Sequence, residues 1–124
     1  MDDGRIIIEG VNASISGFDT VLSSFDDGEA MVVAAGRGCW LSKLDIKAAY
    51  RHIPIHPSDY HLLGFRWRDR FYYDRCLPFG MSSSVWRFEQ YSTAIQWMAQ
   101  HHYGRILMYL VHYIDDYLLV NIGI

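Results

Sequence analysis

The sequence predicts one mixed α/β domain, of the α+β kind, in which an antiparallel sheet is backed by helices. The chain has 124 residues, 51% of them hydrophobic and 15% aromatic, which suffices for one domain with a core. Apolar residues at helical spacing fill the stretch 83–102, which predicts a long helix. Runs of strand composition precede and follow it, at 39–45 and 106–122.

The first part of the chain divides into a lead-in and a short helix. Residues 1–23 show no sustained period and are interrupted by Gly, Asn and Ser, so we expect an irregular lead-in there and the domain itself over 24–124. Ser24 is followed by two aspartates and an apolar stretch, which predicts a helix capped by this serine. Gly36 ends it.

Strand patterns follow the short helix. Alternation over 39–45 predicts a strand whose last residue is the carboxylate Asp45, followed by a tight turn. Two aromatic-rich runs, 62–67 and 71–75, flank the charged segment Arg68-Asp69-Arg70, and this pattern predicts a hairpin. Its arginines could contact phosphates, or they could simply be solvated at the hairpin tip.

A long helix is predicted after the break at Leu77-Pro78-Phe79-Gly80. Ser82, Ser83 and Ser84 can cap it, and it runs to about His102. Its core-facing stripe is expected to consist of Val85, Phe88, Ser92, Ile95, Met98 and Ala99.

The last segment, 106–122, returns to strand composition but has Asp115 and Asp116 at its centre, where two strands would turn back on one another. Burying such charges costs several kcal/mol unless they are paired, hydrogen-bonded or bound to a cation. If the strand that ends at Asp45 is a neighbour, two or three carboxylates converge. Oxygen-only ligands favour magnesium or manganese, which suggests two-metal phosphoryl transfer. The alternative to a metal site is that Asp115 and Asp116 simply lie in an exposed hairpin turn.

Charge is distributed unevenly along the chain. Residues 1–35 carry seven acidic groups and one basic group, whereas the rest carries ten basic and seven acidic groups. Three of those seven acids are Asp45, Asp115 and Asp116, so the remaining surface suits a phosphate-bearing partner, with an ordinary solvated surface as the alternative.

Cys39 and Cys76 are expected to be reduced. With no membrane-spanning window and no secretory signal, we expect an intracellular protein of the cytoplasm or nucleus that is not secreted.

Five segments, in this order, resemble the palm of a reverse transcriptase, an RNA-dependent DNA polymerase. They are Leu44-Asp45-Ile46-Lys47-Ala48-Ala49-Tyr50-Arg51, Ile53-Pro54-Ile55-His56-Pro57, Leu63-Gly64-Phe65, Leu77-Pro78-Phe79-Gly80 and Tyr113-Ile114-Asp115-Asp116. The resemblance covers about 24–120. The amino-acid sequence from His56 to Phe65 is most similar to that in retrotransposons that encode a tyrosine recombinase.

The resemblance implies a metal site. Asp45 and Asp115 would bind two Mg²⁺ ions, for which Mn²⁺ could substitute, and Asp116 would be a third catalytic carboxylate. In this family the backbone carbonyl after the first aspartate also serves a metal, and here that residue is Ile46.

The resemblance also implies a nucleotide site. The amides of Ala48 and Ala49 would face the incoming triphosphate, in keeping with anion binding by successive N–H groups. Tyr50 corresponds to the aromatic gate that excludes a ribose 2′-OH, with a plain core tyrosine as the alternative. Phe79 and Gly80 match the loop under the nucleotide and the template.

The activity implied is RNA-directed DNA synthesis, a nucleotidyl transfer within a retrotransposon polymerase. The partners would be an RNA or DNA template with a DNA primer, and a deoxynucleoside triphosphate, with Tyr113 beside the primer end. One metal ion would lower the pKa of the primer 3′-OH, and the other would hold the triphosphate and the leaving pyrophosphate. The oligomeric state stays open.

Two other hypotheses compete with polymerase activity. The matched segments leave the fingers incomplete and include no thumb, so the chain could be an inactive remnant of a mobile-element polymerase. It could also be a nucleic-acid-binding module that uses the hairpin arginines without turnover. The alternative fold is a partly ordered molecule that keeps mainly the long helix and the central hairpins.

Overall fold

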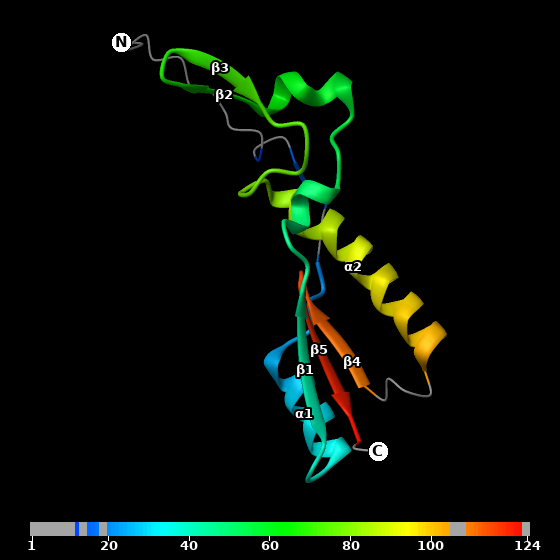
Figure 1. Ribbon diagram of the computed structural model, residues 1–124. Helices are drawn as coiled ribbons and strands as arrows, with labels where there is room; N and C mark the ends of the chain where they lie inside the picture. The colour runs from blue at the N-terminus through cyan, green and yellow to red at the C-terminus, as the bar shows by residue number, and fades with distance from the viewer. Residues whose placement is uncertain (1–11, 13–14, 18–19, 105–108, 123–124) are drawn as a thin grey trace.

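The computed structural model describes residue 12 and residues 15–17, 20–104 and 109–122 (Figure 1). The elements within this part of the chain confirm the expected α+β class. In chain order they are α1 (Phe25–Ala35), β1 (Trp40–Asp45), the 3-10 helices η2 (Ala49–His52) and η3 (Pro57–Leu63), β2 (Gly64–Trp67), β3 (Arg70–Tyr73), α2 (Ser82–Tyr103), β4 (Tyr109–Tyr113) and β5 (Asp116–Asn121).

The elements form an elongated arrangement with the β2–β3 hairpin at one end and a three-stranded sheet at the other (Figure 1). The sheet lies between α1 and α2. On β5, the Leu118 side chain approaches Gly28 of α1, whereas the neighbouring Tyr117 bonds to Ser92 of α2. Successive strand residues point to opposite faces, so α1 and α2 cover opposite faces of the sheet.

The sheet has the order β1-β5-β4, and both of its strand pairs are antiparallel. This order confirms that the strand ending at Asp45 is a neighbour of the hairpin that carries the two aspartates. Asp45 pairs directly with Asp116 on one side, and Tyr113 pairs with Asp116 on the other. The edge strand β1 is exposed along its whole length.

Helix α1 begins as its sequence predicts. The Ser24 hydroxyl accepts from the Asp27 N–H, and the Asp27 carboxylate accepts from the Ser24 N–H, so the two residues form a capping box. The helix ends at Gly36, whose positive φ of 82° favours glycine. Its N–H donates to the Val32 carbonyl.

Replacing Gly28 with alanine is expected to stabilise the protein by roughly 0.5–1 kcal/mol, because Gly28 lies inside α1, where glycine is entropically unfavourable. An added Cβ would lie 3.3 Å from the end of the Leu118 side chain. Leu118 borders a cavity of about 750 Å³ between α1 and the sheet, so its side chain has room to move. Urea unfolding measures the change in the free energy of unfolding. A midpoint at a lower urea concentration than that of the wild-type chain would mean that Leu118 cannot move.

Helix α2 runs from Ser82 to Tyr103, close to the expected bounds, but the expected serine cap is wrong. The N-cap is Met81, which makes no side-chain cap bond. Instead, the Ser82 N–H donates to the side chain of the distant Asn12 at 2.7 Å, and the Ser84 hydroxyl donates to the Pro78 carbonyl at 2.8 Å. Serine-rich sequence alone could not reveal that the helix start takes its cap from residue 12.

The expected stripe of α2 is only partly buried. Phe88 and Ser92 are completely buried, whereas Met98 is 54% exposed. A core cluster gathers Phe88 with Ala49, Tyr50 and Leu77. Because Ile114 packs against this cluster, the core lies directly beneath the β4–β5 turn.

Two expectations about the chain as a whole can be compared with the described residues. Cys39 and Cys76 are free thiols, as expected. Among the helices of the described ranges, none has the length and apolar character to cross a membrane.

Candidate active site

The site is built where β1 ends and the β4–β5 hairpin turns. The turn consists of Ile114 and Asp115, and Asp116 opens β5. The Ile46 N–H donates to the Asp115 carbonyl at 2.9 Å, which ties the residue after Asp45 to the turn. The backbone therefore brings the three predicted carboxylates to the same end of the sheet, because Asp45 also pairs with Asp116.

One of the carboxylates, that of Asp116, is paired with a lysine. The Lys43 Nζ lies 3.1 Å from the Asp116 Oδ1, in a pair whose side chains are 71% and 44% exposed. Such an exposed pair contributes at most about 1 kcal/mol to stability. Within the ranges that the structure describes, no group of three or more His, Cys, Asp or Glu side chains could hold a metal ion. The backbone matches the expected convergence, and the described residues show no cluster of three such side chains there.

The donor atoms available at this end of the sheet suit a hard divalent cation. They are carboxylate oxygens from Asp45 and Asp115 and backbone carbonyl oxygens, with no sulfur or imidazole ligand at these positions. The chemistry of the donors therefore fits magnesium.

Two residues at the site have a left-handed backbone although neither is glycine. Ala48, in the turn before η2, has φ 55° and ψ 44°, and Ile114 has φ 55°. For a β-branched residue such as isoleucine this conformation is a genuine outlier, and it costs on the order of 1–3 kcal/mol. Surrounding contacts must offset that cost, and α2 supplies them.

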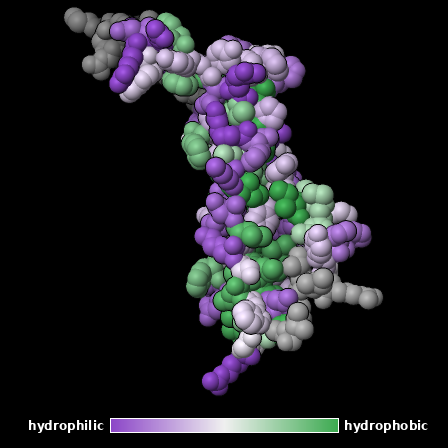
Figure 2. Space-filling model, viewed as in Figure 1, coloured by the Kyte–Doolittle hydropathy of each residue, from purple (hydrophilic) through white to green (hydrophobic). Residues whose placement is uncertain are grey.

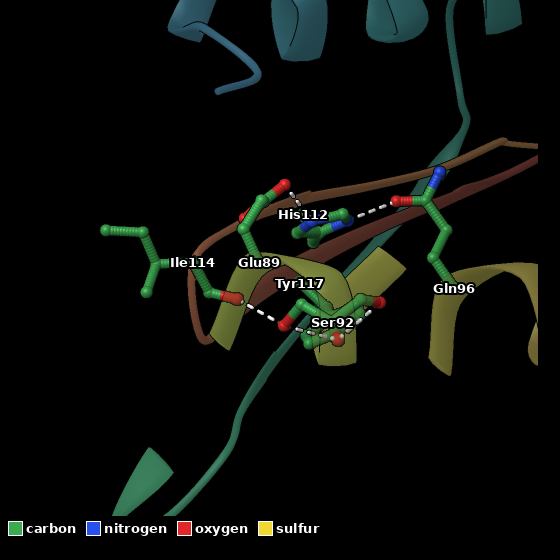
Figure 3. Close-up of polar contacts among 6 residues, drawn as sticks. All are labelled: Glu89, Ser92, Gln96, His112, Ile114 and Tyr117. Atoms are coloured by element: carbon green, nitrogen blue, oxygen red, sulfur yellow. Dashed lines mark hydrogen bonds and ion pairs between the residues drawn. The ribbon is translucent and has the colours of Figure 1, made fainter. Parts of the chain in front are cut away.

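Ser92 of α2 is the main support of the turn (Figure 3). It is completely buried, and its hydroxyl donates to the carbonyl of Ile114. The Tyr117 hydroxyl in turn donates to Ser92 Oγ at 2.9 Å, and its distance to the Ser92 carbonyl is 3.1 Å. Ser92 therefore connects the strained turn to β5 through a buried chain of hydrogen bonds.

A second buried group lies beside it on the same face of α2 (Figure 3). The Nε2 atom of His112 is 2.6 Å from Glu89 Oε1, and its Nδ1 bonds to the side chain of Gln96. The other Glu89 oxygen, Oε2, is buried without a hydrogen-bond partner among the described residues. His112 is thus held from both ring nitrogens, one residue before Tyr113.

These supporting residues were not assigned a role from the sequence. Ser92 was expected only as a member of a core stripe. A usable signal does exist: Glu89, Ser92 and Gln96 recur at spacings of three and four, so they form a polar row on one helix face. His112 and Tyr117 are paired across the β4–β5 hairpin and therefore face that row together.

Tyr50 lies in the core below the turn and is 8% exposed. Its ring contacts Phe79 at 5.2 Å between centroids and Phe88 at 5.7 Å, edge-on. Burial raises the pKa of the Tyr50 phenol, and the nearby charges of Asp115 and Tyr113 raise it further. The core alternative considered for Tyr50 therefore describes its position, while its role as a gate stays a prediction.

Replacing Tyr50 with phenylalanine is expected to reduce the loss of stability at alkaline pH. The pKa of Tyr50 is higher in the folded state than in the unfolded state, where it is near 10. The contribution of this difference to the free energy of unfolding is therefore complete below pH 10 and is lost as the pH rises through the folded pKa. Phenylalanine cannot ionise. Urea unfolding at neutral pH and at about pH 11 checks this, and an equal alkaline loss in both proteins would contradict it.

The remaining predicted contact residues lie around this core. Phe79 is 81% exposed and Tyr113 is 53% exposed, so both rings present surface to a ligand. Gly80 has a positive φ of 83°, and its carbonyl accepts from the Asn12 side chain at 2.8 Å. Ala49 is buried at the start of η2.

Comparison with known protein families identifies the family of this chain. The family model described as reverse transcriptase (RNA-dependent DNA polymerase) matches residues 4–123. The chain belongs to the reverse transcriptase family. Its class is therefore that of a nucleotidyltransferase, and the family acts on nucleic acid and deoxynucleoside triphosphates with divalent metal ions. No curated protein matches this reverse transcriptase chain.

Proposed function

We propose that this reverse transcriptase chain carries the palm active site of a retrotransposon polymerase, which joins a deoxynucleotide to the 3′-OH of a DNA primer on an RNA template. The main support is the backbone bond from Ile46 to Asp115, which places the end of the Asp45 strand against the aspartate turn. Two segments 70 residues apart, each matching a family motif, meet at this bond.

In this proposal, Asp45, Asp115 and the Ile46 carbonyl would hold two Mg²⁺ ions. Bound there, the ions supply a more acidic primer 3′-OH and neutralise charge on the transferred phosphate. The chain's own contribution is positioning, because α2 fixes the turn through Ser92 before substrate arrives. Asp116 has the smaller role, since Lys43 already pairs with it.

The nucleotide would lie against η2 and the loop before α2. The Ala48 and Ala49 amides would face the triphosphate, and the Phe79–Gly80 loop would lie beneath the base. Tyr50 is wedged against Phe79 and Phe88, so its ring cannot easily swing aside, and a rigid ring suits a gate that excludes a ribose 2′-OH. The half-exposed Tyr113 would lie beside the primer end.

Two finer assignments belong to the same proposal. The amino-acid sequence from His56 to Phe65 supports a retrotransposon of the type that encodes a tyrosine recombinase. The division into a lead-in over 1–23 and a palm over 24–124 stays a prediction, and the family match itself extends upstream to residue 4.

Primer extension by the purified 124-residue chain tests the proposal. A labelled DNA primer on an RNA template, with all four deoxynucleotides and MgCl₂, is expected to be elongated. Chelation with EDTA should stop elongation, and fresh magnesium should restore it. A folded chain that elongates no primer on RNA or DNA, with Mg²⁺ or Mn²⁺, would be an inactive remnant instead.

A further inference from the structure

The β2–β3 hairpin presents two faces of different character. Strand residues alternate between faces, and the pairing places Phe65 opposite Tyr72 and Trp67 opposite Arg70. These four residues share one face, here called the Trp67 face. Arg66, Phe71 and Tyr73 share the other, here called the Phe71 face.

The two faces differ in how their charges are matched. On the Phe71 face, Arg66 forms an ion pair with Asp69, and Tyr73 stacks on Tyr60 of η3 with ring centroids 4.9 Å apart. In the part of the chain that the structure describes, Arg68 and Arg70 form no ion pair with a carboxylate. Each face has one arginine over a ring: the guanidinium of Arg68 lies 5.5 Å from the ring centre of Trp67, and that of Arg66 lies 5.8 Å from the ring centre of Phe71.

Aromatic rings on the Trp67 face are open to solvent. Trp67 is 60% exposed, Phe65 is 52% exposed, and the Phe65 and Tyr72 rings are stacked with centroids 5.6 Å apart. Figure 2 shows hydrophilic and apolar residues side by side at the hairpin end, whereas apolar surface is more extensive over the sheet. Three of the five residues 66–70 are arginines and one is an aspartate, so the tip has a net positive charge.

We propose that the Trp67 face binds the single-stranded part of a nucleic-acid template. Flat rings beside arginines that form no ion pair with another described residue are complementary to stacked bases and to phosphates, which is the recurrent chemistry of single-strand binding. The hairpin projects from the same end of the sheet as the aspartate turn, so a strand leaving the turn can reach it (Figure 1). The assignment of this strand as the template rests on the proposed function, whereas its binding requires no turnover.

The hairpin offers a matched control for each kind of contact, because the other face carries the same residue types. Trp67→Ala is matched by Phe71→Ala, which removes a ring that is 83% exposed. Arg70→Gln is matched by Arg66→Gln, which removes the same charge from the paired arginine. Trp67→Phe retains a ring for stacking and serves as the conservative variant.

Fluorescence anisotropy with fluorescein-labelled U20 and dT20 oligonucleotides, without nucleotides or metal, tests the inference on the full chain. Trp67→Ala should weaken binding roughly tenfold, and Trp67→Phe should retain most of it. The slope of log affinity against log salt should fall by about 0.7 for Arg70→Gln. Phe71→Ala and Arg66→Gln should bind like wild type, and circular dichroism verifies that each variant is folded.

Several results would overturn the inference. One is a wild-type chain that binds neither oligonucleotide, and another is equal weakening by the substitutions on both faces. If Trp67→Ala leaves oligonucleotide binding intact but converts a dimer into a monomer in light scattering, the face belongs to a second copy of the chain. In each case primer extension can still succeed, so failure here is distinct from failure of the proposed polymerase activity. Stronger binding of U20 or of dT20 identifies which template is preferred.

Discussion

Replacing Asp115 with asparagine is expected to lower nucleotide incorporation by roughly 1,000-fold or more, and Asp45→Asn should have the same effect. Loss of a metal-binding carboxylate removes several kcal/mol of charge stabilisation from the transition state, and each 1.4 kcal/mol is a factor of ten in rate. Asparagine keeps the size of the side chain, so the bond between Ile46 and the Asp115 carbonyl remains possible. Single-nucleotide primer extension measures the rate.

Suitable comparisons isolate the site from general effects of charge. Asp26→Asn removes a carboxylate from the exposed first turn of α1 and should leave incorporation unchanged. Asp116→Asn should lose less activity than Asp115→Asn, because Lys43 already neutralises Asp116. Urea unfolding should show that all variants are folded. A magnesium-dependent Asp115→Asn protein with near wild-type rates would refute the site.

Replacing His112 with leucine is expected to lower the free energy of unfolding by roughly 3–5 kcal/mol. The change leaves the buried Glu89 without a partner on either oxygen, since its Oε2 already has none among the described residues. The side chain of Gln96 also loses its partner. Urea unfolding followed by circular dichroism measures the loss, which is a large fraction of the stability of a small domain.

The double replacement Glu89→Leu/His112→Leu distinguishes an unpaired buried acid from simple loss of packing. Removing both polar partners together is often nearly neutral, so the double variant should regain most of the lost stability. His61→Leu, at an exposed position of η3, is the matched control and should change stability by no more than about 0.5 kcal/mol. A double variant that is less stable than His112→Leu would show that the loss of stability comes from lost packing and not from an unpaired buried acid.

Local patterns predicted most of the elements. Ser24 and the aspartates after it specified the start of α1, and alternation before Asp45 specified β1. The serine cap of α2 failed because the partner of the Ser82 N–H is Asn12, which is 70 residues away. Met98 follows the helical period but is exposed, since burial depends on what covers the helix.

In the functional site, too, some features were predicted from the sequence and others depended on contacts between distant segments. Asp45 and Asp115 were identified from ordered motifs, and the sheet places their segments side by side. The buried supports, Ser92 and the His112–Glu89 pair, received no role, because polar residues in a helical stripe acquire partners only after the helix docks on the sheet. Lys43 lies two residues before Asp45 in the sequence, but its pairing with Asp116 depends on the register of β1 and β5.

The sequence by itself determined the α+β class, the main helices and strands and the order of the family motifs, since these depend on residue spacing within short windows. The tertiary structure decided three things. It set Asp45 opposite Asp116, it buried Tyr50 between two aromatic rings, and it fastened the aspartate turn to α2 through Ser92. The physical reason is that such contacts join residues 22 to 71 positions apart in the chain. Only the packed chain brings them within hydrogen-bonding distance.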